Sequence, residues 1–139
     1  MVDINYEEVE NLGISPDFFV EWFTKVVENE GKVLDEISLI FCSDDYLLEI
    51  NQQHLGHDYY TDIVTFDYCW EDHVSGDLFI SLDRVRENAV EFKTDFMNEL
   101  NRVVIHGVLH LCGYKDKSDD EETMMRSKED AALSILGST

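Results

Sequence analysis

Two runs of residues with high strand propensity lie close together in the middle of the chain. They are DIVTF at 62–66 and GDLFIS at 76–81, with only some ten residues between them. A parallel strand pair needs a crossover of about a dozen residues or more, usually a helix, so these two strands are predicted to be antiparallel neighbours. Any fold for this chain must therefore accommodate a hairpin.

Two more strands are predicted nearer the start of the sequence. Within residues 2–9, Val2, Ile4 and Tyr6 share one face at alternate positions, which indicates a half-buried strand at or near a sheet edge. Residues 33–42, VLDEISLIFC, are rich in β-branched and aromatic residues and are apolar on both faces near their end, as expected of a covered central strand. The sheet is therefore predicted to have four strands.

Capping residues mark the helices between and after these strands. N-cap serines, the single proline at a first helical position and glycine stops set most of the boundaries. The helices predicted from them cover roughly 16–30, 44–55, 83–92, 97–112 and 119–136. We predict an α+β fold, a four-stranded mixed β-sheet packed with about five α-helices, in a single domain over residues 1–139.

The chain is strongly acidic, with 31 acidic and 10 basic residues and a formal net charge of −21. Such a charge favours solubility and repels nucleic acid at long range, and no DNA partner is expected. The acidity is uneven: residues 1–83 hold 20 acids and 2 bases, whereas residues 84–139 hold 11 acids and 8 bases. The repulsion is therefore concentrated in the first part of the chain.

Cysteine usage and hydropathy point to the cytoplasm. The three cysteines are widely spaced and include no CxxC pair, which speaks against a disulfide framework and against a cysteine zinc cluster. No apolar run reaches 18 residues, and the first residues form neither a basic nor an apolar leader region. We therefore expect free thiols, no membrane partner and a cytoplasmic location.

The stretch HGVLHLCGYKD, residues 106–116, carries a candidate metal site. His106 and His110 are one helical turn apart, so both imidazoles can face one ion. Gly113 is suited to the left-handed conformation that ends a helix and turns the chain back, which would let Asp116 complete the site. Two imidazoles and one carboxylate leave a coordination position open, as in catalytic zinc sites.

The histidine spacing by itself leaves other interpretations open. A packed structural pair on a helix would produce the same spacing, and Gly107 occupies the position where an HExxH protease carries its general-base glutamate. A set of two histidines and one carboxylate also admits iron or manganese in place of zinc. The residues alone therefore indicate a metal site whose metal they do not specify.

Three stretches resemble the YbeY family of bacterial metal-dependent endoribonucleases. HGVLHLCGYKD is similar to the family signature H-G-x-L-H-L-x-G-Y-D-H, INQQHLGHDYYTDIVTF at 50–66 to L-N-x-x-Y-R-G-x-x-x-P-T-D-V-L-S-F, and GDLFIS to G-D-I-x-I-S. The resemblance covers roughly residues 33–137. It implies zinc binding, cleavage of single-stranded RNA, and a role in ribosomal RNA maturation and ribosome quality control, with RNA and the ribosome as partners.

The resemblance also assigns roles to residues. It implies metal binding and catalysis by His106, His110 and Asp116, with Asp116 standing where the family signature has a third histidine. Lys115 replaces the preceding family aspartate. Leu55 replaces a family arginine that is implicated in RNA cleavage.

Nearby residues are candidates to contact RNA in place of that arginine. We assign substrate binding to Lys115, His54 and Arg102. Arg102 belongs to a modest positive rim predicted near the histidines, which also includes Arg84, Arg86, Lys93, Lys115 and Lys117. His57 and Tyr59 are expected to be ordinary solvated loop residues. The missing arginine and the acidity leave two alternative functions open, a non-catalytic ribosome-assembly factor with a structural metal and a small-substrate metallohydrolase.

Overall fold

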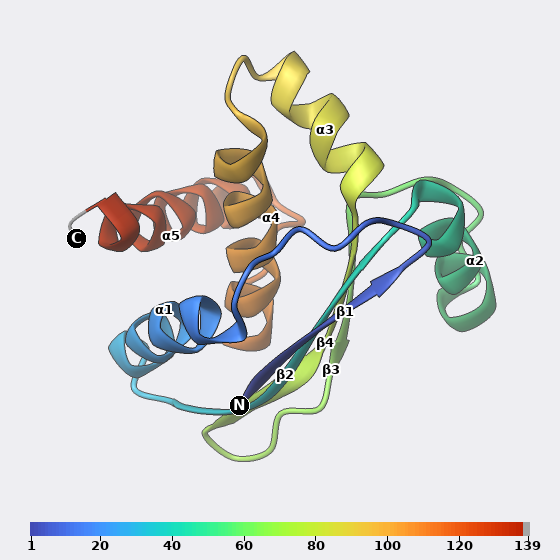
Figure 1. The fold of residues 1–139 in the computed structure, drawn as a ribbon. Coiled ribbons are helices and arrows are strands. Elements are labelled where there is room, and N and C mark those ends of the chain that lie inside the picture. Colours follow the sequence, from blue (N-terminus) through green and yellow to red (C-terminus); the bar gives the residue numbers. More distant parts are fainter. Residues whose placement is uncertain (138–139) are drawn as a thin grey trace.

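The computed structural model describes residues 1–137, which form one sheet with helices packed around it (Figure 1). In chain order the elements are β1 (Val2–Glu7), α1 (Pro16–Asn29), β2 (Val33–Cys42), α2 (Asp44–Leu55), β3 (Ile63–Asp67), β4 (His73–Ser81), α3 (Leu82–Glu91), α4 (Phe96–Leu111) and α5 (Asp119–Gly137). The predicted α+β fold, with a four-stranded sheet and five helices, is confirmed for this part of the chain. None of these helices is both long and apolar enough to cross a membrane.

The sheet has the strand order β1-β2-β4-β3 and is mixed, as predicted. β1 runs parallel to β2 and β2 parallel to β4, while β3 and β4 form the antiparallel hairpin. β4 begins at His73, three residues earlier than predicted, because Val33 and Leu34 of β2 pair with His73 and Val74 and extend the ladder. The hairpin connection is therefore only residues 68–72.

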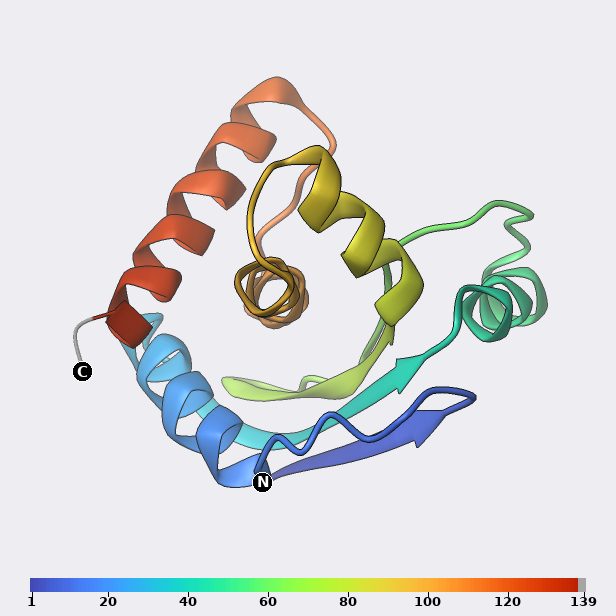
Figure 2. The same ribbon diagram turned by 45° about the horizontal axis from the view of Figure 1, so that its top comes forward.

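Helix α4 lies in the centre of the molecule. Figure 2 views it nearly end-on, inside the concave face of the sheet, with α1, α3 and α5 around its other sides. A helix that is apolar on nearly all sides is stable only inside a core, and most of α4 is apolar and buried. Its main exceptions form one line at positions i, i+3, i+7 and i+11, which we call the polar stripe of α4: Glu99, Arg102, His106 and His110.

Helix α2 packs against the opposite face of the sheet. Its Leu47 meets Cys42 and Val64 in a small second core, with Phe79 of β4 at the margin. The neighbouring Leu78 points to the other face, toward α4. Both faces of β4 are therefore covered, which explains why its sequence is apolar at consecutive positions.

Two glycines allow close contacts at the buried face of the sheet. A Cβ atom on Gly107 of α4 would lie 2.7 Å from Ile63 Cδ1 and 3.0 Å from both methyl groups of Leu78. A Cβ atom on Gly76 of β4 would clash with the backbone oxygen of Phe66. Methyl groups at the ends of side chains can shift, whereas a backbone oxygen of a paired strand cannot move without disturbing the ladder.

Gly76→Ala is therefore expected to destabilise the fold by about 2 kcal/mol or more. Gly107→Ala should cost less, because its overpacking is partly offset by a gain in helix propensity of about 1 kcal/mol. Urea unfolding of the wild type and both variants measures their free energies of unfolding. These values are directly comparable when the three proteins have the same m value. A Gly76→Ala variant as stable as the wild type would contradict the close contact with Phe66.

Candidate metal centre

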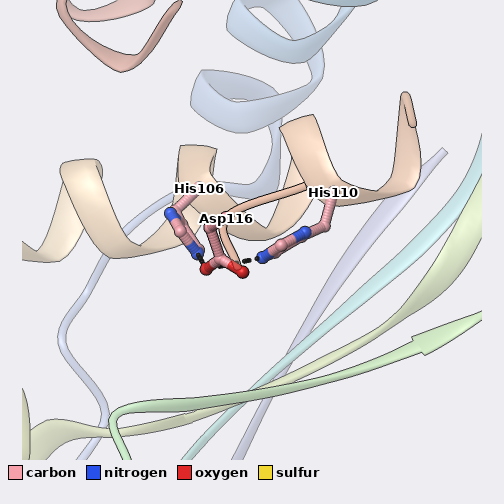
Figure 3. A group of neighbouring side chains, drawn as sticks. All are labelled: His106, His110 and Asp116. Carbon is pink, nitrogen blue, oxygen red and sulfur yellow. Dashed lines mark hydrogen bonds and ion pairs between the residues drawn. The ribbon is translucent and has the colours of Figure 1, made fainter. Parts of the chain in front are cut away.

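Helix α4 presents two histidines to the same space, as their spacing predicted. The rings of His106 and His110 have centroids 4.5 Å apart and planes at 86°. Both side chains are about three-quarters buried, at 22% and 28% exposed, and they point to the same side of α4 (Figure 3). Both imidazoles therefore lie within reach of a single ion.

The chain reverses after α4 and brings Asp116 back over the histidines. Gly113 makes the turn with φ +107, in the positive region that favours glycine. Asp116 Oδ2 then lies 3.2 Å from His106 Nε2 and 3.3 Å from His110 Nε2 (Figure 3). The glycine turn thus places Asp116 where sequence analysis expected the third ligand.

The three donor atoms fit a divalent transition metal. Zinc bonds to nitrogen and oxygen are about 2.0–2.2 Å long, so two ligand atoms of a tetrahedral site lie roughly 3.3 Å apart. The distances of 3.2 and 3.3 Å from Asp116 Oδ2 match this value, and the three donor atoms lie within 4.8 Å of one another. Within residues 1–137, no other group of three or more histidine, cysteine or acidic side chains is gathered so closely.

Hydrogen-bond acceptors hold the outer nitrogen of each ring. His106 Nδ1 lies 2.6 Å from Glu129 Oε2, and His110 Nδ1 lies 2.8 Å from the carbonyl oxygen of Tyr114. Because each acceptor requires a proton on Nδ1, the neutral rings carry their lone pairs on Nε2. Two lone pairs and a carboxylate oxygen therefore converge, an arrangement that a bound cation stabilises.

Glu129 connects His106 to Arg102. Glu129 lies on α5, is 5% exposed, and accepts a hydrogen bond from Arg102 Nη1 at 2.9 Å. Arg102 Nη2 also donates to Asp130 at 2.8 Å. Two carboxylates thus occupy the guanidinium of Arg102, to which we assigned substrate binding, and Arg102 acts on His106 through Glu129.

Sequence reasoning missed Glu129. Along α5, the buried residues Met125, Glu129 and Ala132 follow one another at i, i+4 and i+7. Glutamate therefore stands where the amphipathic pattern calls for an apolar residue, and a charge in such a position is rarely buried without a partner. That interruption was the available signal, although it did not reveal that the partner is His106, 23 residues earlier.

The charges in this network reinforce one another. Burial lowers the pKa of His106, but the hydrogen bond with Glu129 and the charges of Glu129, Asp116 and Asp62 outweigh burial and raise that pKa. Burial raises the pKa of Glu129, but His106 and Arg102 outweigh it, and the pKa of Glu129 is lowered overall. The site therefore attracts positive charge, either a proton on His106 or a metal ion in its place.

Two cavities flank the metal centre and share Asp62, Ile63, His106 and Asp116 in their walls. The first, of about 640 Å³, lies between α3, α4 and α5, and we call it the α3–α5 cavity. The second, of about 540 Å³, is lined by residues of α2, β3 and the loop between them, and we call it the α2–β3 cavity. A polymeric substrate can thus extend from the metal centre in two directions.

The residues considered as RNA contacts are distributed unevenly around these cavities. His54 and Lys115 are exposed and are not among the described residues that line either cavity. Leu55, at the position of the family arginine, does line the α2–β3 cavity. So do His57 and Tyr59, which are exposed loop residues as expected and which share this cavity with His106 and His110.

Ion pairs engage much of the predicted positive rim. Arg84 pairs with Asp44 at 2.6 Å and with Glu87 at 3.1 Å, and Arg86 pairs with Asp83 at 3.8 Å. Neighbouring carboxylates therefore offset much of the charge that these arginines could offer to phosphate.

Comparisons with known proteins agree on one family. The family model described as Endoribonuclease YbeY matches residues 4–137. Curated proteins named Endoribonuclease YbeY from Flavobacterium psychrophilum and Phocaeicola vulgatus are 52% and 49% identical to this chain, over 98% of it and over 96% and 99% of their own lengths. A Thermotoga maritima protein of known solution structure is similar with a TM-score of 0.65 and 31% identity, over 97% of this chain and 92% of that chain.

Asp116→Ala is expected to lose the metal, because the two histidines alone leave an incomplete set of ligands. Elemental mass spectrometry of protein purified without added metal or chelator should find close to one metal ion per chain in the wild type and less than about a tenth of that in the variant. Asp119→Ala, which removes an acidic neighbour at the start of α5, is the control and should keep the metal. Full metal content in Asp116→Ala would assign the third ligand to another residue.

Glu129→Gln is expected to weaken metal binding roughly 10- to 100-fold, since an amide is a poorer acceptor than a carboxylate for the Nδ1–H group of His106. Competition with a chromophoric chelator measures the affinity. Asp130→Asn is the matched control, because Asp130 also pairs with Arg102 and does not contact His106. Equal weakening in both variants would show that the position of Arg102, rather than the hydrogen bond to His106, is what matters.

Proposed function

The chain belongs to the YbeY family of endoribonucleases, and we propose that it is a metal-dependent endoribonuclease that cleaves single-stranded RNA. The observation that supports this most is the convergence of His106 Nε2, His110 Nε2 and Asp116 Oδ2 between two cavities. These three residues would hold one divalent ion at the point where a bound strand passes from one cavity to the other.

We assign zinc to this site. Two imidazoles and a carboxylate with an open position are typical of catalytic zinc, and the same donor set accepts iron or manganese. A metal ion bound there would act as a Lewis acid and neutralise the negative charge that develops on the phosphodiester.

The protein contributes orientation and control of protons. Glu129 and the carbonyl group of Tyr114 hold the Nδ1 protons of His106 and His110, so each ring keeps Nε2 directed at the ion. Arg102 keeps Glu129 in place from the next turn of α4. Most of these groups lie on two packed helices, which limits the movement of the site.

The α2–β3 cavity is suited to an unpaired nucleotide. His57 and Tyr59 stack with centroids 5.2 Å apart and planes at 20°, and Tyr59 Oη lies 3.1 Å from His57 Nδ1. Exposed aromatic faces bind bases by stacking, at roughly 1–3 kcal/mol per base. Lys117 in the same wall offers a cation to phosphate. Because a base in a duplex cannot reach such a platform, this arrangement favours single strands.

The negative charge of the protein affects which partners it can bind. At −21, the chain repels free RNA at long range, so a partner with complementary charge would speed the encounter with RNA. Ribosomal RNA held in a ribosome has such a partner, because basic ribosomal proteins can face the acidic surface while the RNA reaches the metal centre. We therefore assign ribosomal RNA in the cytoplasm as the target.

Purified protein loaded with zinc should cleave an unstructured oligoribonucleotide and leave the same sequence intact when it is paired in a duplex. His110→Ala should reduce the cleavage rate by at least about a hundredfold, because the metal centre loses a ligand. Gel analysis of labelled RNA measures the rates, and Asp119→Ala is again the control that should retain activity.

Cleavage that persists in His110→Ala would contradict the proposal. Co-sedimentation with ribosomes without any cleavage would favour the non-catalytic assembly factor. Turnover of small phosphodiesters without cleavage of RNA would favour the small-substrate metallohydrolase.

A further inference from the structure

Glu99 is a buried carboxylate in the wall of the α3–α5 cavity. It lies in the first turn of α4 and is only 4% exposed. No residue within 1–137 donates a hydrogen bond to this carboxylate; its interactions are longer-range charge effects, Arg102 foremost. Asp62, in the same wall, differs because it accepts a hydrogen bond from Asn88 Nδ2 at 3.3 Å. Glu99 is therefore left with acceptor capacity toward the cavity.

Burying the carboxylate of Glu99 without a hydrogen-bond donor costs free energy unless a ligand supplies the donor. Burial of the side chain carries a desolvation cost, which raises the pKa of Glu99 while the charge of Arg102 partly lowers it. An exposed carboxylate would serve the helix dipole equally well, so the first-turn position does not explain the burial. A ligand with N–H donors would remove the cost.

The distance from Glu99 to the metal centre matches the length of one nucleotide. Glu99 and His106 lie on the polar stripe of α4, seven residues apart, which is roughly 10 Å along the helix axis. This span is comparable with that from the phosphate of a nucleotide to the far edge of its base. A nucleotide with its phosphate at the metal centre can therefore place its base edge at Glu99.

We propose that the α3–α5 cavity binds a guanine base of the substrate and that the carboxylate of Glu99 determines this preference. Guanine has two adjacent donors on its Watson–Crick edge, N1–H and N2–H, and a carboxylate can accept both. Adenine, cytosine and uracil each place an acceptor beside their single donor group, and that acceptor would face the carboxylate. The inference rests on the proposed ribonuclease function, since it specifies a nucleotide next to the cleaved bond.

The remaining walls of the cavity also suit a base. Phe92 is 58% exposed and offers an aromatic face, while Ile63 and Val103 add apolar surface. The aromatic face can stack on a nucleobase, and the apolar surface can enclose it.

Two other ligands fit the cavity less well. A phosphate group would face the carboxylates of Glu99, Asp62 and Glu129. Of the two arginines in the wall, Arg102 is engaged by Glu129 and Asp130, and Arg126 lies 3.8 Å from Glu129. A second metal ion would lack ligands, because the metal centre is the only gathered group of three or more ligands in residues 1–137. A base with N–H donors is the ligand that these acceptors favour.

Titration of the four 5′-mononucleotides into the zinc-loaded full chain, followed by calorimetry, tests the proposal. GMP should bind at least roughly tenfold more tightly than AMP, CMP or UMP, and Glu99→Gln should remove this advantage because its amide sets an N–H group against an N–H group. Glu122→Gln is the matched control, since it removes an exposed carboxylate from the rim of the same cavity and should keep the preference. Equal binding of all four nucleotides by the wild type, or the same loss in both variants, would overturn the proposal.

Sequencing of the ends produced from a random single-stranded RNA pool separates this inference from the nuclease function. The wild type should show guanine enriched at one fixed position beside the cut, and Glu99→Gln should still cut but without that enrichment. Cutting without any enrichment would overturn the guanine assignment and leave the nuclease function standing. Selective GMP binding without any cutting would overturn the nuclease function and retain guanine recognition by Glu99.

Discussion

The metal centre depends on the burial of α4 in the concave face of the sheet. The helix is apolar on nearly all sides, so the sheet, α3 and α5 pack on it and fix both its position and its rotation. The contact between α4 and β4 is close because Gly107 has no side chain to separate them. This rigid placement orients His106 and His110 before any ligand arrives.

The polar stripe of α4 is satisfied in two different ways. Arg102 and the Nδ1 atoms of both histidines are paired with acceptors from the protein itself. The Nε2 atoms of the histidines converge instead on Asp116 Oδ2, at 3.2 and 3.3 Å, and Glu99 lines the α3–α5 cavity. The converging donor atoms mark the place for a metal ion, and the carboxylate of Glu99 is the group to which we assign a base.

The electrostatics of the site differ from those of a typical RNA-binding surface. Arg102, one turn from His106, is already paired with Glu129 and Asp130, and Leu55 offers phosphate none of the N–H donors that an arginine would. In the proposed function, a metal ion bound by these ligands would be the main positive charge at the site. The proposed stacking on Tyr59 and acceptance of N–H donors by Glu99 would supply recognition that does not depend on attraction to phosphate.

The sequence by itself determined the local features of this protein. Caps and periodicity located every helix, a connection too short for a crossover implied the hairpin, and the cluster of His106, His110 and Asp116 followed from a glycine turn within eleven residues. Such features depend on backbone preferences over one or two turns. Tertiary structure alone decided where β4 begins, that Arg102 and Glu129 orient His106, and that His57 and Tyr59 line one cavity with both histidines. These features depend on contacts between segments distant in the chain, and no local periodicity records which segments will meet.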